Sequence, residues 1–503
     1  MKWSALAVVL MSAAACSSGK SASGPASSTT STTRPRYQPV YAKGPCNDEV
    51  PKSPHVTCGT LTVPEDRSKP DGRKVVLPVA IVHAAGHPTP DPVVYFSGGP
   101  GFAGLPAVQG FLKHGYTADR DVIIFDQRGT GDAKPSLACP EVYTANALNN
   151  ADVRVRFDVA RKRFAGAVRA CAHRLRAAGV DLNQYNTTAV AQDAADLRRA
   201  LRIKKWNLFG VSYGTTVALQ TMRADAEGIR SVVVDSVFPP DVAWNSTQTV
   251  HDFARIQRVF FDGCASDPAC HARYPHLEAD YHEAVKVLDG HPYRTRYTDP
   301  FSKKNTPFVI DGATATSGFF QALYDSDLIP LLPGVIEQIK AGTAGPILEG
   351  LVQQLGPDIN GAAEAQHQAV NCSDRANSVR DDDAPKLVAQ NSDYSRFLIS
   401  YTVCSAIDVA PAPAGFADAV RSDIPTLVLG DEYDPVTPPD DSRHTAQALS
   451  HATFVLFPGL GHGAVFSDRP CPITIFKAFL AAPTARVNSS CVSSMGPPKW
   501  AVG

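Results

Sequence analysis

One serine of the chain lies between two glycines, directly after a short apolar run at residues 206–209. The segment reads Gly210-Val211-Ser212-Tyr213-Gly214 and continues into a stretch with helical spacing. A strand, a sharp turn and a helix in this order hold a serine in strained backbone geometry, and a side chain at either glycine would collide with a neighbouring strand or helix. The pattern therefore predicts that Ser212 is a catalytic nucleophile.

A carboxylate for the same chemistry is expected after a later strand. A serine hydroxyl is a weak nucleophile, so it needs a histidine base and an acid that orients the base, in the chain order Ser, Asp, His. The strand-like residues 426–429 are followed by Asp431, Glu432 and Asp434. Asp434 is the predicted acid because it lies on the loop beyond the strand, where Pro435 stiffens the turn. Asp431 and Glu432 are the alternatives.

The base is expected at His462. This histidine stands between Gly461 and Gly463, shortly after the strand-like residues 453–457. Catalytic groups gather at the carboxyl ends of parallel strands, so His462 and Asp434 would meet there. The alternative is a histidine on a surface loop.

Donors for an oxyanion are expected after the strand-like residues 93–96. This run ends in Ser97-Gly98-Gly99-Pro100-Gly101. Acyl transfer needs N–H donors for the developing negative charge, and glycines let backbone N–H groups approach a substrate closely. The predicted donors are the backbone N–H groups of Gly99 and Tyr213. A plain Gly/Pro turn is the alternative.

The elements that must position these residues form an alternating pattern. Short runs rich in Val, Ile and Leu suit strands that are buried on both faces. Strands that alternate with helices predict an α/β fold with a mostly parallel sheet wrapped by helices. Helices are expected at 153–178 and 189–203, the second capped by Thr187 or Thr188, and strands at 75–82, 93–96, 122–125, 206–209, 231–234, 426–429 and 453–457.

The alternation stops after Asp235 and resumes at Pro425. The region between them has its own cysteines, several helical stretches and Pro/Gly-rich joints, so we expect a large, mainly helical cap domain inserted into the α/β core. The sequence thus predicts five segments: a signal peptide (1–15), a lipid-anchored flexible linker (16–44), the first part of the core (45–240), the cap (241–422) and the C-terminal part of the core (423–503).

Residues 1–15 have the pattern of an export signal. A charged start precedes an apolar run at 5–15, which is shorter than the about 20 residues of a membrane-spanning helix. The run ends in Ala13-Ala14-Ala15-Cys16, which is similar to the bacterial lipoprotein processing site and predicts lipidation of Cys16. Cleavage nearby, with Cys16 left as a free thiol, is the alternative. Residues 17–39 are too poor in apolar side chains to fold and are interpreted as a tether.

The chain has 11 cysteines, and ten remain when Cys16 is set aside. An even number in an exported chain predicts five disulfides. No CxxC pair occurs, so no metal site is predicted. Sequence order alone leaves the connectivity open, and pairing of neighbours would give Cys46–Cys58, Cys139–Cys171, Cys264–Cys270, Cys372–Cys404 and Cys471–Cys491.

Composition and charge exclude several classes of protein. The 48 basic and 49 acidic residues give a net charge of -1, which provides no basic field for nucleic acid. A hydrophobic share of 44% and a charged share of 19% exclude wholesale disorder and a multi-span membrane protein. No nucleic-acid partner and no cofactor are expected. Membrane attachment is expected only through the lipid anchor, and the oligomeric state stays open.

Taken together, the motifs resemble the prolyl-aminopeptidase-like α/β-hydrolases, and more closely their exported tripeptidyl-aminopeptidase-like branch. The resemblance extends from about Cys46 to Cys491. It implies the α/β-hydrolase fold and a Ser-Asp-His serine hydrolase, often an exopeptidase that releases short peptides from free N-termini, with some members acting as esterases. The residues that carry it are Ser97-Gly98-Gly99-Pro100-Gly101, Asp126-Gln127-Arg128-Gly129-Thr130-Gly131, Gly210-Val211-Ser212-Tyr213-Gly214, Asp434 and Gly461-His462-Gly463.

Several further polar residues have expected places. Asp126 and Arg128 are predicted to form a structural ion pair. An aminopeptidase must bind the substrate ammonium group with carboxylates that face the cleft, and Asp374 and Glu432 are the candidates. Each of them is alternatively a solvated surface charge. Residues 366–368, Gln-His-Gln, are expected on a helix surface, and a place in the lining of the cleft is the alternative.

These features predict an exported, extracellular or cell-envelope-associated serine hydrolase. The leading function is an aminopeptidase that acts on peptide substrates through an acyl-enzyme. A carboxylesterase or acyl hydrolase, with an ester substrate and the same triad, is the first alternative. A catalytically silent binding lipoprotein that kept the fold is the second.

Overall fold

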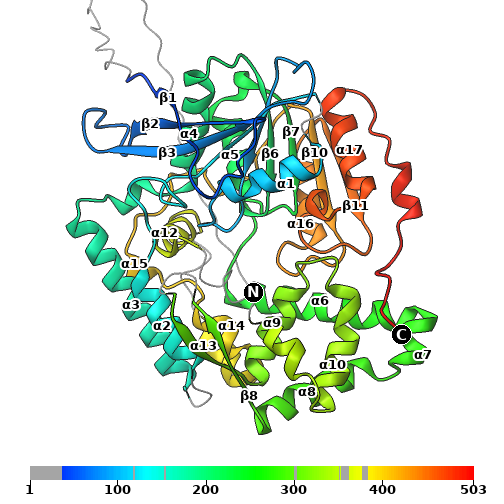
Figure 1. Ribbon diagram of the computed structural model, residues 1–503. Coiled ribbons are helices and arrows are strands. Elements are labelled where there is room, and N and C mark those ends of the chain that lie inside the picture. Colours follow the sequence, from blue (N-terminus) through cyan, green and yellow to red (C-terminus); the bar gives the residue numbers. More distant parts are fainter. Residues whose placement is uncertain are drawn as a thin grey trace, which may run out of the picture. The chain divides into compact units, whose positions relative to one another are not determined.

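The computed structural model describes residues 37–503 except 117–118, 152–154, 300–302, 351, 353–361 and 376–382 (Figure 1). By compactness the chain divides into Met1–Gln38 and Pro39–Gly503, and every element named below lies in the second unit. The predicted signal peptide, Cys16 and most of the predicted linker lie outside the described residues.

A nine-stranded sheet forms the centre of this unit, with the strand order β1-β2-β3-β5-β4-β6-β7-β10-β11. From β5 to β11 in this order neighbouring strands are parallel, whereas β1, β2 and β3 run antiparallel to their neighbours. The predicted α/β fold with a mostly parallel sheet is confirmed. The strands are β1 (Val40–Gly44), β2 (Val56–Pro64), β3 (Lys74–Val82), β4 (Val93–Phe96), β5 (Val122–Phe125), β6 (Trp206–Val211), β7 (Ile229–Asp235), β10 (Thr426–Asp431) and β11 (Ala452–Phe457).

Every strand expected from the sequence is present, and several are longer than predicted. Strands β1 and β2 were not predicted, because β1 is largely exposed and β2 is buried over only part of its length. Neither therefore forms the continuous apolar run that marks a strand buried on both faces.

Helices cover both faces of the sheet. In β4, Val94 and Phe96 pack against α4 and α5, whereas Val93 and Tyr95 pack on the other face against α1 and α17. None of the helices among the described residues is long and apolar enough to cross a membrane. The helices of the core are α1 (Val108–Lys113), α2 (Pro140–Asn150), α3 (Phe157–Ala177), α4 (Thr187–Ala200), α5 (Tyr213–Ala224), α16 (Pro439–Ala448) and α17 (Pro470–Ala481).

The start of α4 differs from the prediction. The N-cap is Asn186, whose side chain accepts a hydrogen bond from the N–H of Ala189 at 2.9 Å. Thr187 is fully buried instead, and its hydroxyl lies 2.8 Å from the hydroxyl of Tyr213. The expected cap at Thr187 or Thr188 is wrong because Asn caps as well as Thr and the buried threonine has another partner.

A long segment is inserted between β7 and β10. Among its residues that the structure describes, none joins the nine-stranded sheet. Its elements are α6 (Ser246–Ser266), α7 (Pro268–Arg273), α8 (Leu277–Gly290), the hairpin of β8 (Tyr293–Thr298) and β9 (Asn305–Ile310), α9 (Gly312–Ala322), α10 (Leu332–Lys340), α12 (Glu364–Asp374), α13 (Ala384–Gln390), α14 (Ser395–Ile399) and α15 (Cys404–Ile407).

The inserted segment packs in two parts. Helices α6 to α10 share a core that includes Phe253, Phe260 and Phe319. Helices α12 and α15 share a different core with α3, in which Ala369 lies in the same cluster as Phe164. The second part of the insertion is therefore continuous with the helices of the core, and the bounds 241–422 of a separate cap stay a prediction.

Five disulfides join the ten cysteines of the described residues. Each links neighbours in sequence order, so the structure decides the connectivity that the sequence left open in favour of the pairing of neighbours. The pairs are Cys46–Cys58, Cys139–Cys171, Cys264–Cys270, Cys372–Cys404 and Cys471–Cys491.

Candidate active site

Ser212 lies at the sharp turn between β6 and α5. Its backbone angles, φ 59° and ψ -131°, are costly for a residue with a side chain. A Cβ atom at Gly210 would collide with the carbonyl oxygen of Gly214, and a Cβ atom at Gly214 would collide with that of Phe96. Only glycine fits at both positions, so the turn that exposes the serine depends on the two glycines that flank it.

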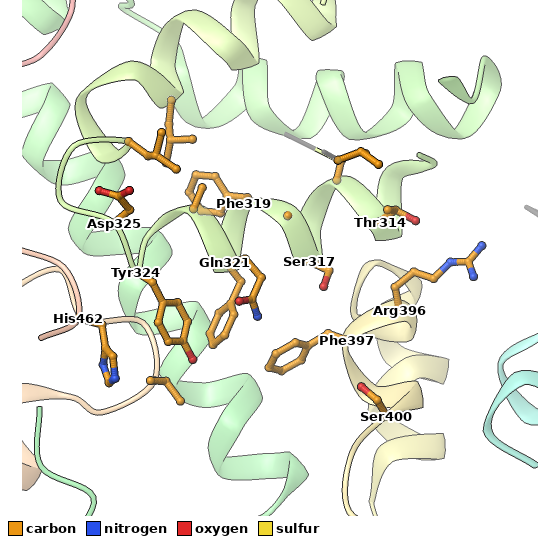
Figure 2. Close-up of a pocket in the computed structure, with 18 of the residues that line it drawn as sticks. Thr314, Ser317, Phe319, Gln321, Tyr324, Asp325, Arg396, Phe397, Ser400 and His462 are labelled. Atoms are coloured by element: carbon orange, nitrogen blue, oxygen red, sulfur yellow. The ribbon is translucent and has the colours of Figure 1, made fainter. Parts of the chain in front are cut away.

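His462 lies on the loop after β11, where its imidazole meets Asp434. The Nδ1 atom of His462 is 2.7 Å from Oδ2 of Asp434. The backbone N–H of His462 donates to the carbonyl oxygen of Tyr324 at 3.1 Å. The two rings lie 4.9 Å apart between centroids, and Figure 2 shows the phenol of Tyr324 beside the imidazole. Three contacts thus hold His462: one to its backbone N–H, one to a ring nitrogen and one between its ring and that of Tyr324.

Asp434 is fully buried, and both oxygen atoms of its carboxylate accept hydrogen bonds. Its Oδ1 accepts hydrogen bonds from the N–H groups of Val436 and Thr437, both at 2.9 Å. Its Oδ2 accepts one from the hydroxyl of Thr437 at 2.7 Å in addition to the imidazole contact. This network fixes the orientation of the carboxylate toward the imidazole.

The two alternative acids have other partners. Asp431 accepts hydrogen bonds from the N–H groups of Gly463 and Ala464, both at 3.2 Å. Glu432 accepts one from the N–H of Gly459 at 2.8 Å. The structure therefore brings the third acid of the segment, and neither of its neighbours, to the imidazole.

The charges of His462 and Asp434 stabilise each other. Burial lowers the pKa of His462, but the negative charge of Asp434 and the hydrogen bond to it outweigh burial, so the pKa lies above its ordinary value. Burial raises the pKa of Asp434, but the charge of His462 and the hydrogen bonds to the carboxylate outweigh this, so the pKa lies below its ordinary value. The carboxylate thus stabilises the imidazolium that forms when His462 takes up a proton.

Neighbouring strand ends bring Ser212 and His462 to the same place. The N–H of Ser212 donates to the carbonyl oxygen of Asp235 at 3.1 Å. The side chain of Asp235 accepts the N–H of Val465, on the loop that follows the histidine, at 2.9 Å. Within the described part of the chain no hydrogen bond joins the serine hydroxyl to the imidazole, and in free enzymes this contact often closes only with substrate.

The glycine segment after β4 lies against Ser212. A Cβ atom at Gly98 would lie 3.4 Å from the Oγ atom of Ser212. Gly99 has a φ of 113°, which favours glycine, and it lines the cavity described below. Tyr213 begins α5, so its N–H is one of the first helical N–H groups, which have no acceptor within the helix. Both predicted oxyanion donors therefore belong to segments in contact with the serine.

Asp126 and Arg128 do not form the predicted ion pair. Arg128 makes two hydrogen bonds of 2.7 Å to the carboxylate of Asp193 on α4. Asp126 accepts the N–H groups of Gly104 at 2.8 Å and Leu105 at 3.1 Å. The prediction is wrong because the guanidinium reaches across to α4, whereas the Asp126 carboxylate closes the turn behind the glycine segment. Both residues are structural.

A cavity of about 920 Å³ adjoins this site, with Gly99, His462 and Gly463 in its wall. Much of the remaining wall comes from the inserted segment. Figure 2 shows Gln321 of α9 and Phe397 of α14 projecting toward the same space. Large apolar side chains from several elements also line the cavity: Phe308, Ile310, Phe319, Phe320, Leu332, Val335 and Ile336.

The two carboxylates predicted to bind an ammonium group do not line this cavity. Asp374 is buried and accepts the N–H of Thr187 at 3.3 Å, and burial raises its pKa to about 7. Glu432 holds the loop at Gly459 as described. A carboxylate that does line the cavity is that of Glu364, half-buried at the start of α12. The sequence reasoning missed Glu364 because nothing in its neighbours marks it as facing a cleft.

Helix α12 contacts the glycine segment directly. The N–H of Ala363 donates to the carbonyl oxygen of Gly101 at 2.9 Å. The Nδ1 atom of His367 lies 2.9 Å from the carbonyl oxygen of Pro100. The residues on either side of His367 are fully buried. The prediction of a helix surface at residues 366–368 is therefore wrong for the two glutamines, because a segment of the core covers them, whereas His367 lines the cavity, which was the alternative.

A mostly parallel sheet with a strained serine after one strand and a histidine–aspartate pair after two others defines an α/β-hydrolase. Two family models match the chain, the α/β hydrolase fold over residues 91–266 and TAP-like protein over residues 391–491. The chain has the α/β-hydrolase fold, and its carboxyl-terminal segment is similar to TAP-like protein.

Three relatives come from two bacterial genera. The chain is 25% identical over 456 residues to serine protease Hip1 of Mycobacterium tuberculosis, covering 85% of each chain. It is 29% identical over 351 residues to tripeptidyl aminopeptidase of Streptomyces lividans, covering 63% of this chain and 60% of that protein. It is 26% identical over 452 residues to carboxylesterase B of Mycobacterium tuberculosis, covering 82% of each. These matches place the chain among the serine hydrolases, as the sequence predicted.

Proposed function

We propose that this chain is a serine peptidase that cleaves peptides with free N-termini through an acyl-enzyme. In this proposal Ser212 is the nucleophile, His462 the general base and Asp434 the acid that orients the base. The backbone N–H groups of Gly99 and Tyr213 receive the oxyanion. The observation that carries the proposal is the 2.7 Å contact between Nδ1 of His462 and Oδ2 of Asp434, at the same sheet edge as the strained serine.

The first half of the reaction forms the acyl-enzyme. The Oγ atom of Ser212 attacks the scissile carbonyl carbon while Nε2 of His462 takes the hydroxyl proton. The carbonyl oxygen becomes negatively charged and accepts the two backbone N–H groups. When the tetrahedral intermediate collapses, the C–N bond breaks and the leaving amine takes the proton from the imidazolium.

The second half releases the acyl group. A water molecule attacks the ester carbon and gives a proton to His462, and the same backbone donors receive the second oxyanion. The C–O bond to Ser212 breaks, its oxygen takes the proton back, and the carboxylic acid leaves. Throughout, the Asp434 carboxylate stays ionised beside the imidazole.

The position of the cavity favours a peptide substrate whose N-terminal part lies among residues of the inserted segment. Glu364 accepts a hydrogen bond from Nε2 of Gln368 at 2.8 Å through its Oε1 atom. Its Oε2 atom receives no hydrogen bond from any residue that the structure describes, which leaves it open to an ammonium group. We therefore assign to Glu364 the role for which the sequence proposed Asp374 and Glu432.

The relatives support a peptidase, since two of them are named serine protease and tripeptidyl aminopeptidase. The named carboxylesterase keeps the first alternative open. The apolar part of the cavity wall also fits the acyl chain of an ester, because apolar surface binds alkyl groups without requiring a charged partner.

Matched chromogenic substrates with free and acetylated N-termini test the proposal. We expect acetylation to lower kcat/KM at least about tenfold, which corresponds to about 1.4 kcal/mol of transition-state stabilisation. Equal turnover of the two peptides, together with faster turnover of matched esters, would favour the esterase. No labelling of Ser212 by a fluorophosphonate probe would favour a silent binding protein.

A variant at the ammonium site sharpens this test. Glu364→Gln removes the charge but keeps the size of the side chain, so kcat/KM for the free-amine peptide falls about tenfold and that for the acetylated peptide stays the same. Asp325→Asn is the matched control, because Asp325 also lines the cavity but is exposed. An equal loss for both peptides would contradict the role of Glu364.

We further propose that residues 241–422 act as a cap over the active site. The proposal is supported by the cavity wall, to which α9 and α14 contribute beside His462. Export with lipid attachment at Cys16 is likewise proposed. The five disulfides support passage through an oxidising compartment, and mass spectrometry of the mature amino-terminal peptide would detect the acyl groups.

A further inference from the structure

Two carboxyl groups that the proposed reaction does not use lie together behind His462. Asp235 ends β7 and Asp431 ends β10, which are neighbouring parallel strands. Leu429 is the register partner of Asp235, and Asp431 lies two residues further on, so its side chain points to the same face of the sheet. Both side chains are fully buried. The two carboxyl groups are within hydrogen-bonding reach of each other.

The hydrogen bonds of these carboxyl groups are incomplete. Each Oδ2 atom accepts donors from the protein, whereas each Oδ1 atom is buried without a hydrogen-bond donor among the described residues. A buried acceptor without a donor is costly. Two such acceptors on adjacent carboxyl groups are both satisfied when a single proton lies between them, because the protonated oxygen donates and the other accepts.

The charges around Asp235 and Asp431 also favour a single proton between the two carboxyl groups. The titratable groups that face the pair are Asp434 and His462 on the loops after β10 and β11, and two tyrosines, Tyr95 and Tyr116. In the described part of the chain no lysine or arginine forms an ion pair with either carboxyl group. Burial is the largest cause that raises the pKa of both carboxyl groups, the charge of Asp434 adds to it for both, and the charge of Asp235 further raises the pKa of Asp431. Two uncompensated buried charges side by side would be strongly unfavourable.

The pair also holds the loop that carries the base. The Oδ2 atom of Asp431 accepts the N–H groups of Gly463 and Ala464, and that of Asp235 accepts the N–H of Val465. Three consecutive N–H groups after His462 are therefore bound by the two carboxyl groups. Because the Asp235 carbonyl oxygen accepts the N–H of the nucleophile, the pair connects both ends of the proposed catalytic machinery.

We propose that Asp235 and Asp431 share one proton between their Oδ1 atoms and that this singly charged pair positions the His462 loop relative to Ser212. The remaining negative charge faces the loop N–H groups. Neither residue touches the substrate, so both are positioning residues. The proposal rests on the proposed function only where activity is measured.

The shared proton is tested by counting protons on folding. An unfolded aspartate has a pKa of about 3.9, so near pH 6 the unfolded chain has lost a proton that the folded pair keeps. The contribution of the pair to stability should therefore fall as pH rises from about 4 through the raised pKa. Asp431→Asn replaces the shared proton by an amide N–H and removes one titrating group. The pH dependence of the urea midpoint should then correspond to about one proton less than in the wild type.

Two further variants complete the stability test. Ser236→Ala is the control, because it removes the hydroxyl that donates to Asp431 at 2.8 Å but no carboxyl group. It should lower stability and keep the same number of protons in the pH dependence, while the pKa of Asp431 rises because the hydroxyl that lowers it is lost. Asp235→Asn supplies the same amide donor from the other strand and replaces Asp431→Asn if that variant does not fold. An unchanged pH slope in the asparagine variant would overturn the proposal, whatever the catalytic activity.

Activity tests the positioning role. Asp431→Ala removes the acceptor of the Ala464 N–H and one of the two acceptors of the Gly463 N–H, so kcat should fall about tenfold or more with KM changed less than about twofold. Asp431→Asn keeps an acceptor oxygen and should recover most of this loss. The acid limb of its pH profile should stay in place, whereas the double asparagine variant, which loses the negative charge near His462, should move it to lower pH. Equal loss in the alanine and asparagine variants would overturn the positioning role.

Discussion

A Cβ atom added to Gly98 would lie 3.0 Å from the Cβ atom of Ser212 and 3.4 Å from its Oγ atom. The glycine segment after β4 and the turn after β6 therefore approach each other as closely as a main chain without a side chain allows. This approach brings backbone N–H groups to the serine, which is the arrangement an oxyanion site needs.

We predict that Gly98→Ala impairs catalysis more than folding. The added methyl group crowds the hydroxyl and displaces the glycine segment, so kcat should fall about tenfold or more while the thermal midpoint changes little. Gly110→Ala is the matched control, because a Cβ atom there would meet nothing within 4 Å. Wild-type kcat in the Gly98 variant would contradict the close approach.

Ser212→Ala should abolish hydrolysis and leave the fold intact. The hydroxyl contributes a covalent bond to the reaction rather than packing, and losses for triad members reach about 10⁴ to 10⁶ in kcat. Steady-state kinetics at equal expression and a far-ultraviolet spectrum measure the two effects. Retention of more than about one tenth of the activity would refute Ser212 as the nucleophile.

His367→Ala should weaken the proposed oxyanion site indirectly, through the glycine segment. The variant loses the contact to the Pro100 carbonyl oxygen, so Gly99 is less firmly placed and kcat should fall about tenfold with KM nearly unchanged. His444→Ala serves as control, since His444 contacts Asp241 on the exposed surface. Similar kinetics of the two variants would show that α12 does not hold the glycine segment.

The pH profile should separate peptide from ester substrates. His462 must be neutral to accept the serine proton, and its pKa lies above the ordinary value of about 6.5, so kcat/KM rises with pH through a midpoint above that value. Peptides with a free amine should also lose turnover as that amine deprotonates near about 7.7 to 8.0. We expect a bell-shaped dependence of kcat/KM on pH for peptides with a free amine and a plateau at high pH for esters. A plateau for both would contradict recognition of the ammonium group.

Thiol titration checks the cysteine assignment. The ten cysteines of residues 37–503 are all disulfide-bonded, so denatured, unreduced mature protein should react with about zero equivalents of thiol reagent when Cys16 is acylated. One equivalent would indicate a free Cys16. Two or more would contradict the disulfides.

Patterns that are local in the chain could be predicted from the sequence. The glycines around Ser212 and His462, the apolar strands before Asp434 and the order of these residues are such patterns, and they follow from sterics and burial within a few residues. The buried parallel strands were found for the same reason. The half-exposed strands β1 and β2 were missed, because their exposed residues interrupt the apolar pattern.

Contacts between distant segments were decided only by the tertiary structure. Whether a carboxylate faces a cavity or the interior depends on how helices pack, which is why Asp374 is buried behind α4 and Glu364 lines the cavity. His367 and Pro100 meet although 267 positions separate them in the chain. The shared site of Asp235 and Asp431 likewise exists only because β7 and β10 are neighbours in the sheet. Spacing within one segment carries no information about which remote backbone or carboxyl group will face it, since that is set by the packing of the whole core.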